Sequence, residues 1–214
     1  MDQPVIMANE SIPRTFWHTT FLWCGLLGSI LFNVIYFSFG AMAVHYNMMR
    51  QSIGDLEQLR YGWIQSVNFI LLGISTGALA VALRKELQSG FGVILIPLFY
   101  WLTAAGAIMM GLFISEPAHT YISVLTFVTL PISFLLFSGR FSADPRWRGW
   151  ATYTNMATLL MLLFLIIFWF ARINERPYAG IYERMIVVVR LLWIVVFVLK
   201  LLGGRRMAPV KSNL

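Results

Sequence analysis

Polar side chains that could do chemistry gather in residues 45–69, which connect two long apolar runs and include the start of the second. Four polar residues continue from this segment into the second apolar run, at intervals close to whole helical turns. They are Tyr61, Gln65, Asn68 and Ser75. A polar stripe within a membrane faces other helices or a water-filled cavity. The stripe therefore predicts either amides that bond neighbouring helices or the wall of a ligand pocket.

Charged residues elsewhere in the sequence could complete such a pocket. Arg190 lies well inside the last apolar run, about two turns beyond Glu183. A buried arginine costs about 2.5 kcal/mol or more unless it is paired or its side chain reaches the headgroups. Either Arg190 extends to the headgroups, or Arg190 or Arg184 pairs with a carboxylate over an outward cavity. Such a pair would bind an anionic headgroup or hold the first outer loop down. The candidate carboxylates are Asp55, Glu57 and Glu116.

One further amide could join this group from another helix. Asn33 lies near the middle of the first apolar run and could approach Asn68. We therefore predict one outward-facing polar pocket. Its candidate residues are Asn33, Asp55, Glu57, Tyr61, Gln65, Asn68, Glu183, Arg184 and Arg190.

Two histidines and a carboxylate could form a metal site. They are His45, Glu116 and His119, and such a set can hold a divalent ion. However, Pro117 interrupts the helical spacing between Glu116 and His119, and the sequence contains no His-Glu-x-x-His motif. We interpret the histidines as interfacial residues and predict no metal, no cofactor and no catalytic residue.

The elements that hold these residues are strongly apolar. Of 214 residues, 59% are apolar and 12% are charged. Soluble domains are roughly 45–50% apolar and about 25% charged. A soluble core cannot bury so many apolar side chains, so lipid must solvate part of the surface. The single cysteine, Cys24, excludes an internal disulfide and a thiolate metal site.

Six apolar runs could cross a bilayer as helices. We predict an all-α fold, an integral membrane bundle of six transmembrane helices in one domain, residues 1–214. The helices are expected at about 21–44, 61–83, 91–114, 121–137, 150–170 and 185–202, with a tail at 1–20 and a basic tail at 203–214. Continuous apolar runs exclude a β-barrel, whose strands alternate. Short connections indicate that sequential helices pack antiparallel.

Lysine and arginine are distributed unequally between the two sides of this bundle. The side with both termini carries ten, and the other side carries five. The positive-inside rule therefore places both termini in the cytoplasm of a protein in the cell membrane. The basic charge does not indicate a nucleic-acid partner, because no basic segment with interleaved aromatics is present. We expect the lipid bilayer to be the partner of the basic tail.

Tryptophans near the predicted helix ends are expected to anchor the helices. They are Trp17, Trp63, Trp147 and Trp150. An indole ring is apolar but carries a polar N–H, so it prefers the membrane interface. We therefore expect these four rings to lie at the interface and not in a cofactor site.

Part of the sequence resembles a known membrane family. The motif is Tyr61-Gly62-Trp63-Ile64-Gln65-Ser66-Val67-Asn68-Phe69, and it follows Arg50-Gln51-Ser52-Ile53-Gly54-Asp55-Leu56. Similar residues precede and begin a helix in the bacterial and archaeal family catalogued as domain of unknown function 998. Gly180-Ile181-Tyr182-Glu183-Arg184 is similar to the last helix of that family. The resemblance implies a six-helix membrane protein without an established activity. Its members often carry paired histidines after the third helix, where this chain has only His119.

These observations predict a non-enzymatic, multi-pass membrane protein whose outward-facing polar pocket binds a lipid or a small amphipathic ligand. Two alternatives stay open. One is an accessory subunit or assembly factor of a larger membrane complex, which suits a small chain without a catalytic motif. The other is a membrane enzyme that uses outer carboxylates as acid–base groups, for which two of them must converge on one cavity.

Overall fold

Six long helices make up the part of the chain that the computed structural model describes, residues 15–87, 90–115 and 117–203. The elements are α1 (Phe16–Met42), η1 (Gly54–Gln58), α2 (Trp63–Glu86), α3 (Leu95–Leu112), α4 (Ala118–Ser142), η2 (Pro145–Trp147), α5 (Trp150–Ile173) and α6 (Ala179–Gly203), where η marks a short 3₁₀ helix. Each of the six α-helices is long and apolar enough to cross a membrane. The predicted all-α class and the six spans are confirmed.

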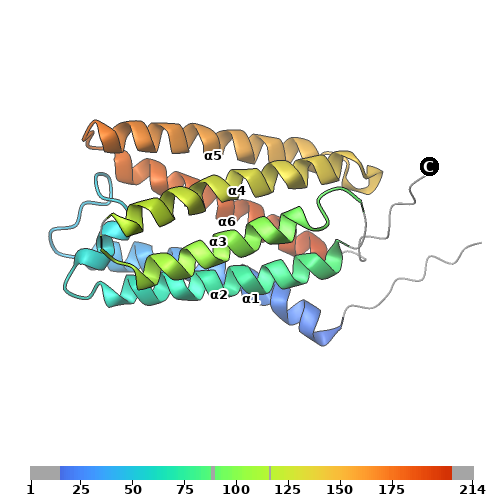
Figure 1. Ribbon diagram of the computed structural model, residues 1–214, viewed down its shortest axis with the longest axis horizontal. Coiled ribbons are helices and arrows are strands. Elements are labelled where there is room, and N and C mark those ends of the chain that lie inside the picture. Colours follow the sequence, from blue (N-terminus) through green and yellow to red (C-terminus); the bar gives the residue numbers. More distant parts are fainter. Residues whose placement is uncertain (1–14, 88–89, 116, 204–214) are drawn as a thin grey trace, which may run out of the picture.

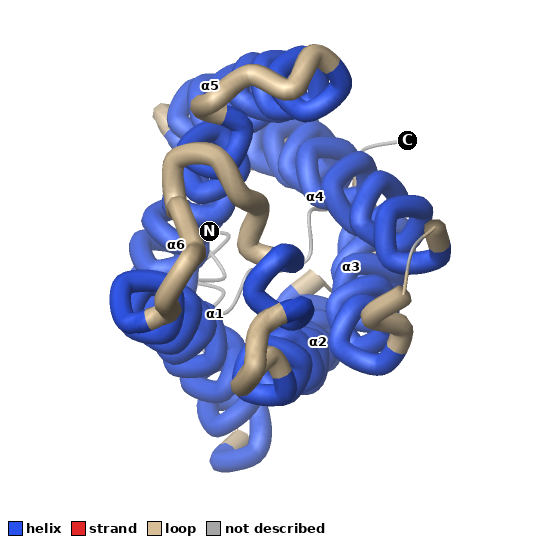
Figure 2. The backbone as a smooth tube through the Cα atoms, turned by 90° about the vertical axis from the view of Figure 1, so that its left-hand side faces the viewer, coloured by secondary structure: helices blue, strands red, loops and turns tan. Residues whose placement is uncertain are grey.

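The six helices form a closed antiparallel ring. Each helix packs against the helices before and after it in the chain, and α6 packs against α1. Figure 2 shows the ring end-on, with η1 lying in front of its centre. We call this the loop end, because it carries the connections α1–α2, α3–α4 and α5–α6. The start of α1 and the end of α6 lie at the opposite end, the termini end (Figure 1).

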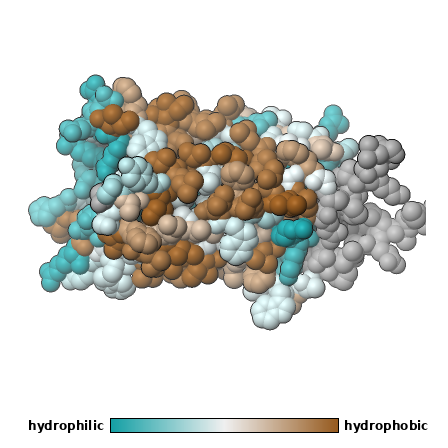
Figure 3. Space-filling model, viewed as in Figure 1, coloured by the Kyte–Doolittle hydropathy of each residue, from teal (hydrophilic) through white to brown (hydrophobic). Residues whose placement is uncertain are grey.

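The outside of the ring is apolar. Leu159, Leu163 and Ile166 of α5 are all exposed, as lipid contact requires of a membrane helix. Figure 3 shows an apolar belt across the bundle and polar side chains at the loop end. The chain is therefore a membrane-embedded protein.

Aromatic rings fill the ring of helices toward the termini end. Phe134 and Phe137 of α4 pack against Trp193 of α6, with ring centroids 4.3 and 5.1 Å apart. Trp193 is fully buried, and its indole N–H donates to Thr154 Oγ1 at 3.0 Å. Trp147, one of the four tryptophans expected at the interface, lies in η2 and is buried against this cluster. Trp17 and Trp63 are exposed near opposite ends of the bundle.

The helix bounds differ from the predicted ones by up to six residues. Helix α4 ends at Ser142 and not near 137, and α6 begins at Ala179 and not near 185. Both predicted bounds stopped short of charged residues, namely Arg140 in α4, and Glu183 and Arg184 in α6. These side chains are buried within the helices. A charge that finds buried partners can continue a helix, so hydropathy alone ends the helix too early. Helix α1 begins at Phe16, inside the predicted tail, and α6 ends at Gly203, the first residue of the predicted basic tail; residues 1–14 and 204–214 lie outside the described ones.

Candidate functional site

A cavity of 190 Å³ lies inside the ring, at the loop-end half of the bundle. Its middle is apolar. This wall consists of Phe69, Leu72, Ala107, Met110, Phe127, Leu130 and Val187. Polar groups line the cavity above and below this wall. The cavity therefore has an apolar middle and two polar ends.

Arg190 and Thr76 form the polar group farthest from the loop end. Arg190 Nη2 donates to Thr76 Oγ1 at 2.9 Å, and the Arg190 Nε has no hydrogen-bond partner. Arg190 is only 6% exposed. In the same region Thr103 and Thr129 share a hydrogen bond of 3.0 Å between their hydroxyls. A cation thus lies within the helix α6, and among the described residues its hydrogen-bond partner is one neutral hydroxyl.

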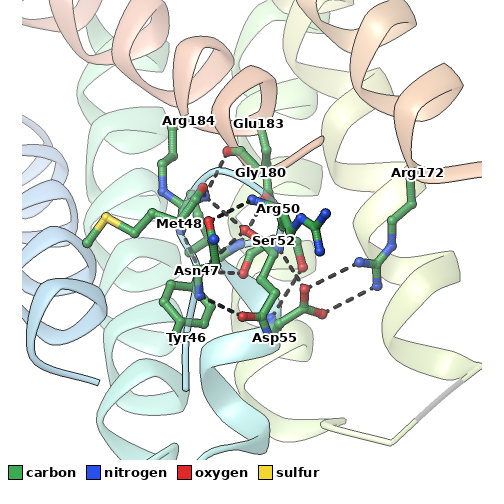
Figure 4. Close-up of polar contacts among 12 residues, drawn as sticks. Tyr46, Asn47, Met48, Arg50, Ser52, Asp55, Arg172, Gly180, Glu183 and Arg184 are labelled. Atoms are coloured by element: carbon green, nitrogen blue, oxygen red, sulfur yellow. Dashed lines mark hydrogen bonds and ion pairs between the residues drawn. The ribbon is translucent and has the colours of Figure 1, made fainter. Parts of the chain in front are cut away.

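The loop between α1 and α2 covers the other end of the cavity, and two carboxylates on the cavity lining hold it. Asp55 Oδ2 accepts from the Ser52 backbone N–H at 2.6 Å, and the Asp55 carboxylate pairs with Arg172 of α5 at 3.3 Å. Glu183 of α6 accepts from the Ile53 backbone N–H at 2.6 Å. Figure 4 shows these contacts converging on the loop. They fix η1 above the cavity.

Arg184 holds the same loop from the side. Its Nη1 donates to the backbone oxygens of Met48 and Gln51, at 2.8 and 3.0 Å, and its Nη2 donates to the Tyr46 hydroxyl. The hydroxyl of Tyr46 in turn donates to Ser52 O at 2.6 Å. Burial raises the pKa of Tyr46 to about 12, so the phenol keeps its proton and remains a donor at neutral pH. One guanidinium thus satisfies several backbone acceptors of one loop.

Two glycines allow this loop to lie so close to the helices. A Cβ at Gly180 would collide with Gln51 O and lie 2.6 Å from Met48 O. A Cβ at Gly62 would collide with the carbonyl of Glu57, where the chain turns into α2. Close backbone approach therefore requires glycine at both positions. Both glycines belong to the sequence segments that resemble the family motif.

Glu57 and His119 form a second polar contact beneath the loop. His119 Nδ1 lies 3.4 Å from Glu57 Oε2, and the Glu57 side chain is buried. Burial raises the pKa of Glu57 from 4.5 to about 7. Because the folded-state pKa exceeds the unfolded value, the folded protein retains this proton between those two pH values.

The raised pKa predicts a pH dependence of stability. The contribution of Glu57 is greatest below about pH 4.5, falls as the pH rises toward about 7, and is constant above. After a discount for partial solvation, the fall amounts to about 1–2 kcal/mol. Glu57→Gln should abolish that part of the pH dependence and stabilise the protein at pH 8. Thermal unfolding in detergent between pH 4.5 and 8 measures it, with the exposed Glu175→Gln as control. A parallel pH dependence in wild type and Glu57→Gln would contradict the assignment.

The amides of the predicted stripe lie against α1. Asn68 Nδ2 donates to Phe32 O of α1 at 3.1 Å and to Gln65 Oε1 at 3.2 Å. Asn33 lies next to this contact but bonds within α1, to Ser29 O and the Tyr36 hydroxyl. None of these three amide side chains lines the cavity. Tyr61, the first residue of the stripe, does not line it either and is exposed. Of the two interpretations of the stripe, this geometry matches the bonding of neighbouring helices.

The structure brings three of the predicted pocket residues to the cavity, Asp55, Glu183 and Arg190. The expected pair between Arg190 or Arg184 and a carboxylate is not formed among the described residues. Asp55 pairs with Arg172 instead, and Arg184 holds the loop through backbone oxygens. Glu57 packs beneath the loop, outside the cavity lining.

The three candidate metal ligands are not brought together in the part of the chain that the structure describes. Glu116 lies outside the described residues. His119 contacts Glu57 and Phe113 O, and His45 is exposed in the α1–α2 connection with a φ of 67°. Among the described residues, no group of three His, Cys, Asp or Glu side chains could hold a metal ion.

Three functional residues were missed in the sequence. Tyr46 and Arg172 were visible as polar residues near predicted helix ends, but nothing in their spacing indicated their partners. Thr76 follows Ser75, which belonged to the stripe. Because successive helical residues turn by about 100°, Ser75 packs against Gly28 of α1 while Thr76 reaches the cavity.

The fold and the cavity define a class, a multi-pass membrane protein built as one ring of six helices. A family model described as "Protein of unknown function (DUF998)" matches residues 26–200, so the chain belongs to that family, as the motif predicted. No curated protein and no solved structure matches the chain.

Proposed function

We propose that this protein is a non-enzymatic membrane protein that binds a lipid or a small amphipathic molecule in its central cavity. The observation that carries the proposal is the cavity itself, with an apolar wall between a buried arginine and a polar loop. Ligand sites in proteins are mostly apolar with a few polar groups that fix orientation.

The carboxylates favour binding over catalysis. Asp55 and Glu183 both line the cavity, as the enzyme hypothesis requires of two acid–base groups. However, Asp55 accepts from the Ser52 N–H and from Arg172, and Glu183 accepts from the Ile53 N–H. Carboxylates engaged in this way hold the loop and have less freedom to exchange protons with a substrate.

We further propose that the loop end faces the outside of the cell membrane and that both termini are cytoplasmic. The support is the charge asymmetry, since the sequence carries ten Lys and Arg toward the termini end and five toward the loop end. The cavity would then receive its ligand from the outer side.

Filling the cavity tests the binding proposal. Ala107 lines the cavity and is 2% exposed, whereas Ala105 faces outward on the same helix. We expect purified wild-type protein to retain a small molecule, and Ala107→Phe to reduce its amount at least about tenfold by occupying its space. Native mass spectrometry and solvent extraction measure the bound molecule. Ala105→Phe should retain the wild-type amount. Equal amounts in wild type and Ala107→Phe would show that this cavity is not the binding site.

A further inference from the structure

Arg190 is a buried cation without a counter-charge among the described residues. Its hydrogen-bond partner there is Thr76, and the residue that interacts with it electrostatically is Tyr100, whose buried hydroxyl itself has no hydrogen-bond partner. The carboxylates of Asp55 and Glu183 are occupied at the other end of the cavity, with the loop. An unpaired charge in a membrane interior is unfavourable, and such residues usually mark the path or site of a ligand.

The free donors of Arg190 determine which chemical group fits. A guanidinium has five N–H donors in a planar fork, of which one is used on Thr76. The unpartnered Nε belongs to a side chain that lines the cavity and is more than nine-tenths buried. The fork matches the two oxygens of a carboxylate, which would neutralise the charge and accept two parallel hydrogen bonds.

The wall above Arg190 determines the rest of the ligand. Phe69, Leu72, Ala107 and Met110 surround the space between Arg190 and the loop, and they offer no charge. The volume of 190 Å³ suits a compact body, and η1 covers it from the loop end. A ligand that satisfies both features is acidic at one end and apolar along its body.

We propose that the cavity binds a compact amphipathic carboxylic acid, with its carboxylate on Arg190 and its hydrocarbon body against the wall of α2 and α3. This inference rests on the proposed binding function and specifies its ligand class. The protein is then a receptor for organic acids of low polarity, and neutral molecules of equal shape bind less well.

Two probes of equal chain length test the charge requirement. Wild-type protein in phosphatidylcholine nanodiscs is titrated with octanoate and with 1-octanol, and binding to empty nanodiscs is subtracted. We expect octanoate to bind at least about tenfold more tightly than octanol. Arg190→Gln should lower the octanoate affinity to that of octanol, and Arg190→Lys should keep part of the difference. The exposed Arg176→Gln is the control and should change the octanoate affinity less than about twofold.

Folding of the variants is checked by thermal unfolding without ligand. Because Arg190→Gln removes an unpaired buried charge, it should be at least as stable as wild type. It should also lose the rise in melting temperature that octanoate gives the wild type. Should Arg190→Gln unfold, the comparison of octanoate with octanol on the wild type still decides the inference.

The outcomes separate this inference from the proposed function. The inference that the ligand is a carboxylic acid is overturned if octanoate and octanol bind equally to the wild type. It is also overturned if octanoate binding survives Arg190→Gln. A neutral molecule that co-purifies with the wild type and is lost in Ala107→Phe overturns it too, although the binding function then stands. The inference is also overturned if inorganic phosphate competes for the site as strongly as octanoate does, because the apolar wall would then contribute nothing to binding. If neither probe binds and nothing co-purifies, the binding function fails as well.

Discussion

Replacing Arg184 with methionine is expected to release the α1–α2 loop and to lower the free energy of unfolding by about 3–5 kcal/mol. The guanidinium donates to Met48 O, Gln51 O and the Tyr46 hydroxyl, and Arg184 is 4% exposed. Methionine fills the space but leaves these acceptors without their donor. Arg184→Lys should recover less than half of the loss, because a single ammonium cannot reach the same set of oxygens.

Limited proteolysis reports the loop directly. Trypsin can cleave after Arg50 and Arg60, which lie on either side of η1. We expect cleavage there to be at least about tenfold faster in Arg184→Met than in wild type. Arg176→Met removes an exposed arginine from the neighbouring α5–α6 connection and should leave the rate unchanged. If Arg184→Met is cleaved at the wild-type rate, other contacts hold the loop.

Replacing Trp193 with alanine is expected to destabilise the bundle by about 3–5 kcal/mol. The ring lies between Phe134, Phe137 and Phe197, with centroid distances of 4.3, 5.1 and 4.6 Å. Inside a membrane, helices associate through such packing and not through transfer out of water, so an unfilled space removes the stabilising contacts themselves. Trp193→Phe should lose less, since it keeps a ring and gives up the hydrogen bond to Thr154.

The control for Trp193 is Leu192, the residue before it on the same helix. Leu192 is 57% exposed and faces lipid, so Leu192→Ala should change stability by less than about 1 kcal/mol. The melting temperature in detergent measures the stability of both variants. Equal effects of Trp193→Ala and Leu192→Ala would contradict the assignment of the aromatic cluster as the packed core.

The number and type of the helices could be predicted from the sequence because hydropathy is a property of each segment alone. The bounds could not be predicted to the residue, because they depend on partners. Glu183 and Arg184 lie in the first turns of α6, and their partners Ile53, Met48 and Gln51 belong to a distant loop. No local pattern in α6 identifies those partners.

The candidate site was predictable in part for the same reason. Arg190 was recognisable as a charge inside an apolar run, and the structure places it in the cavity. Helical spacing grouped Gln65 with Asn68, but the spacing could not say which neighbour that face meets. The answer depends on how α2 is rotated toward α1, which follows from close contacts such as Gly28 with Ser75.

The packed aromatic rings close the cavity toward the termini end of the bundle. Phe134 lies one turn beyond Leu130, and Trp193 lies about one turn beyond Arg190, so stacked aromatics form the floor directly below the deepest lining residues. Packed side chains therefore close the cavity toward the termini end, whereas the α1–α2 loop lines it at the loop end. If the proposed ligand exchanges past η1, its residence time should follow the rate at which the α1–α2 loop opens.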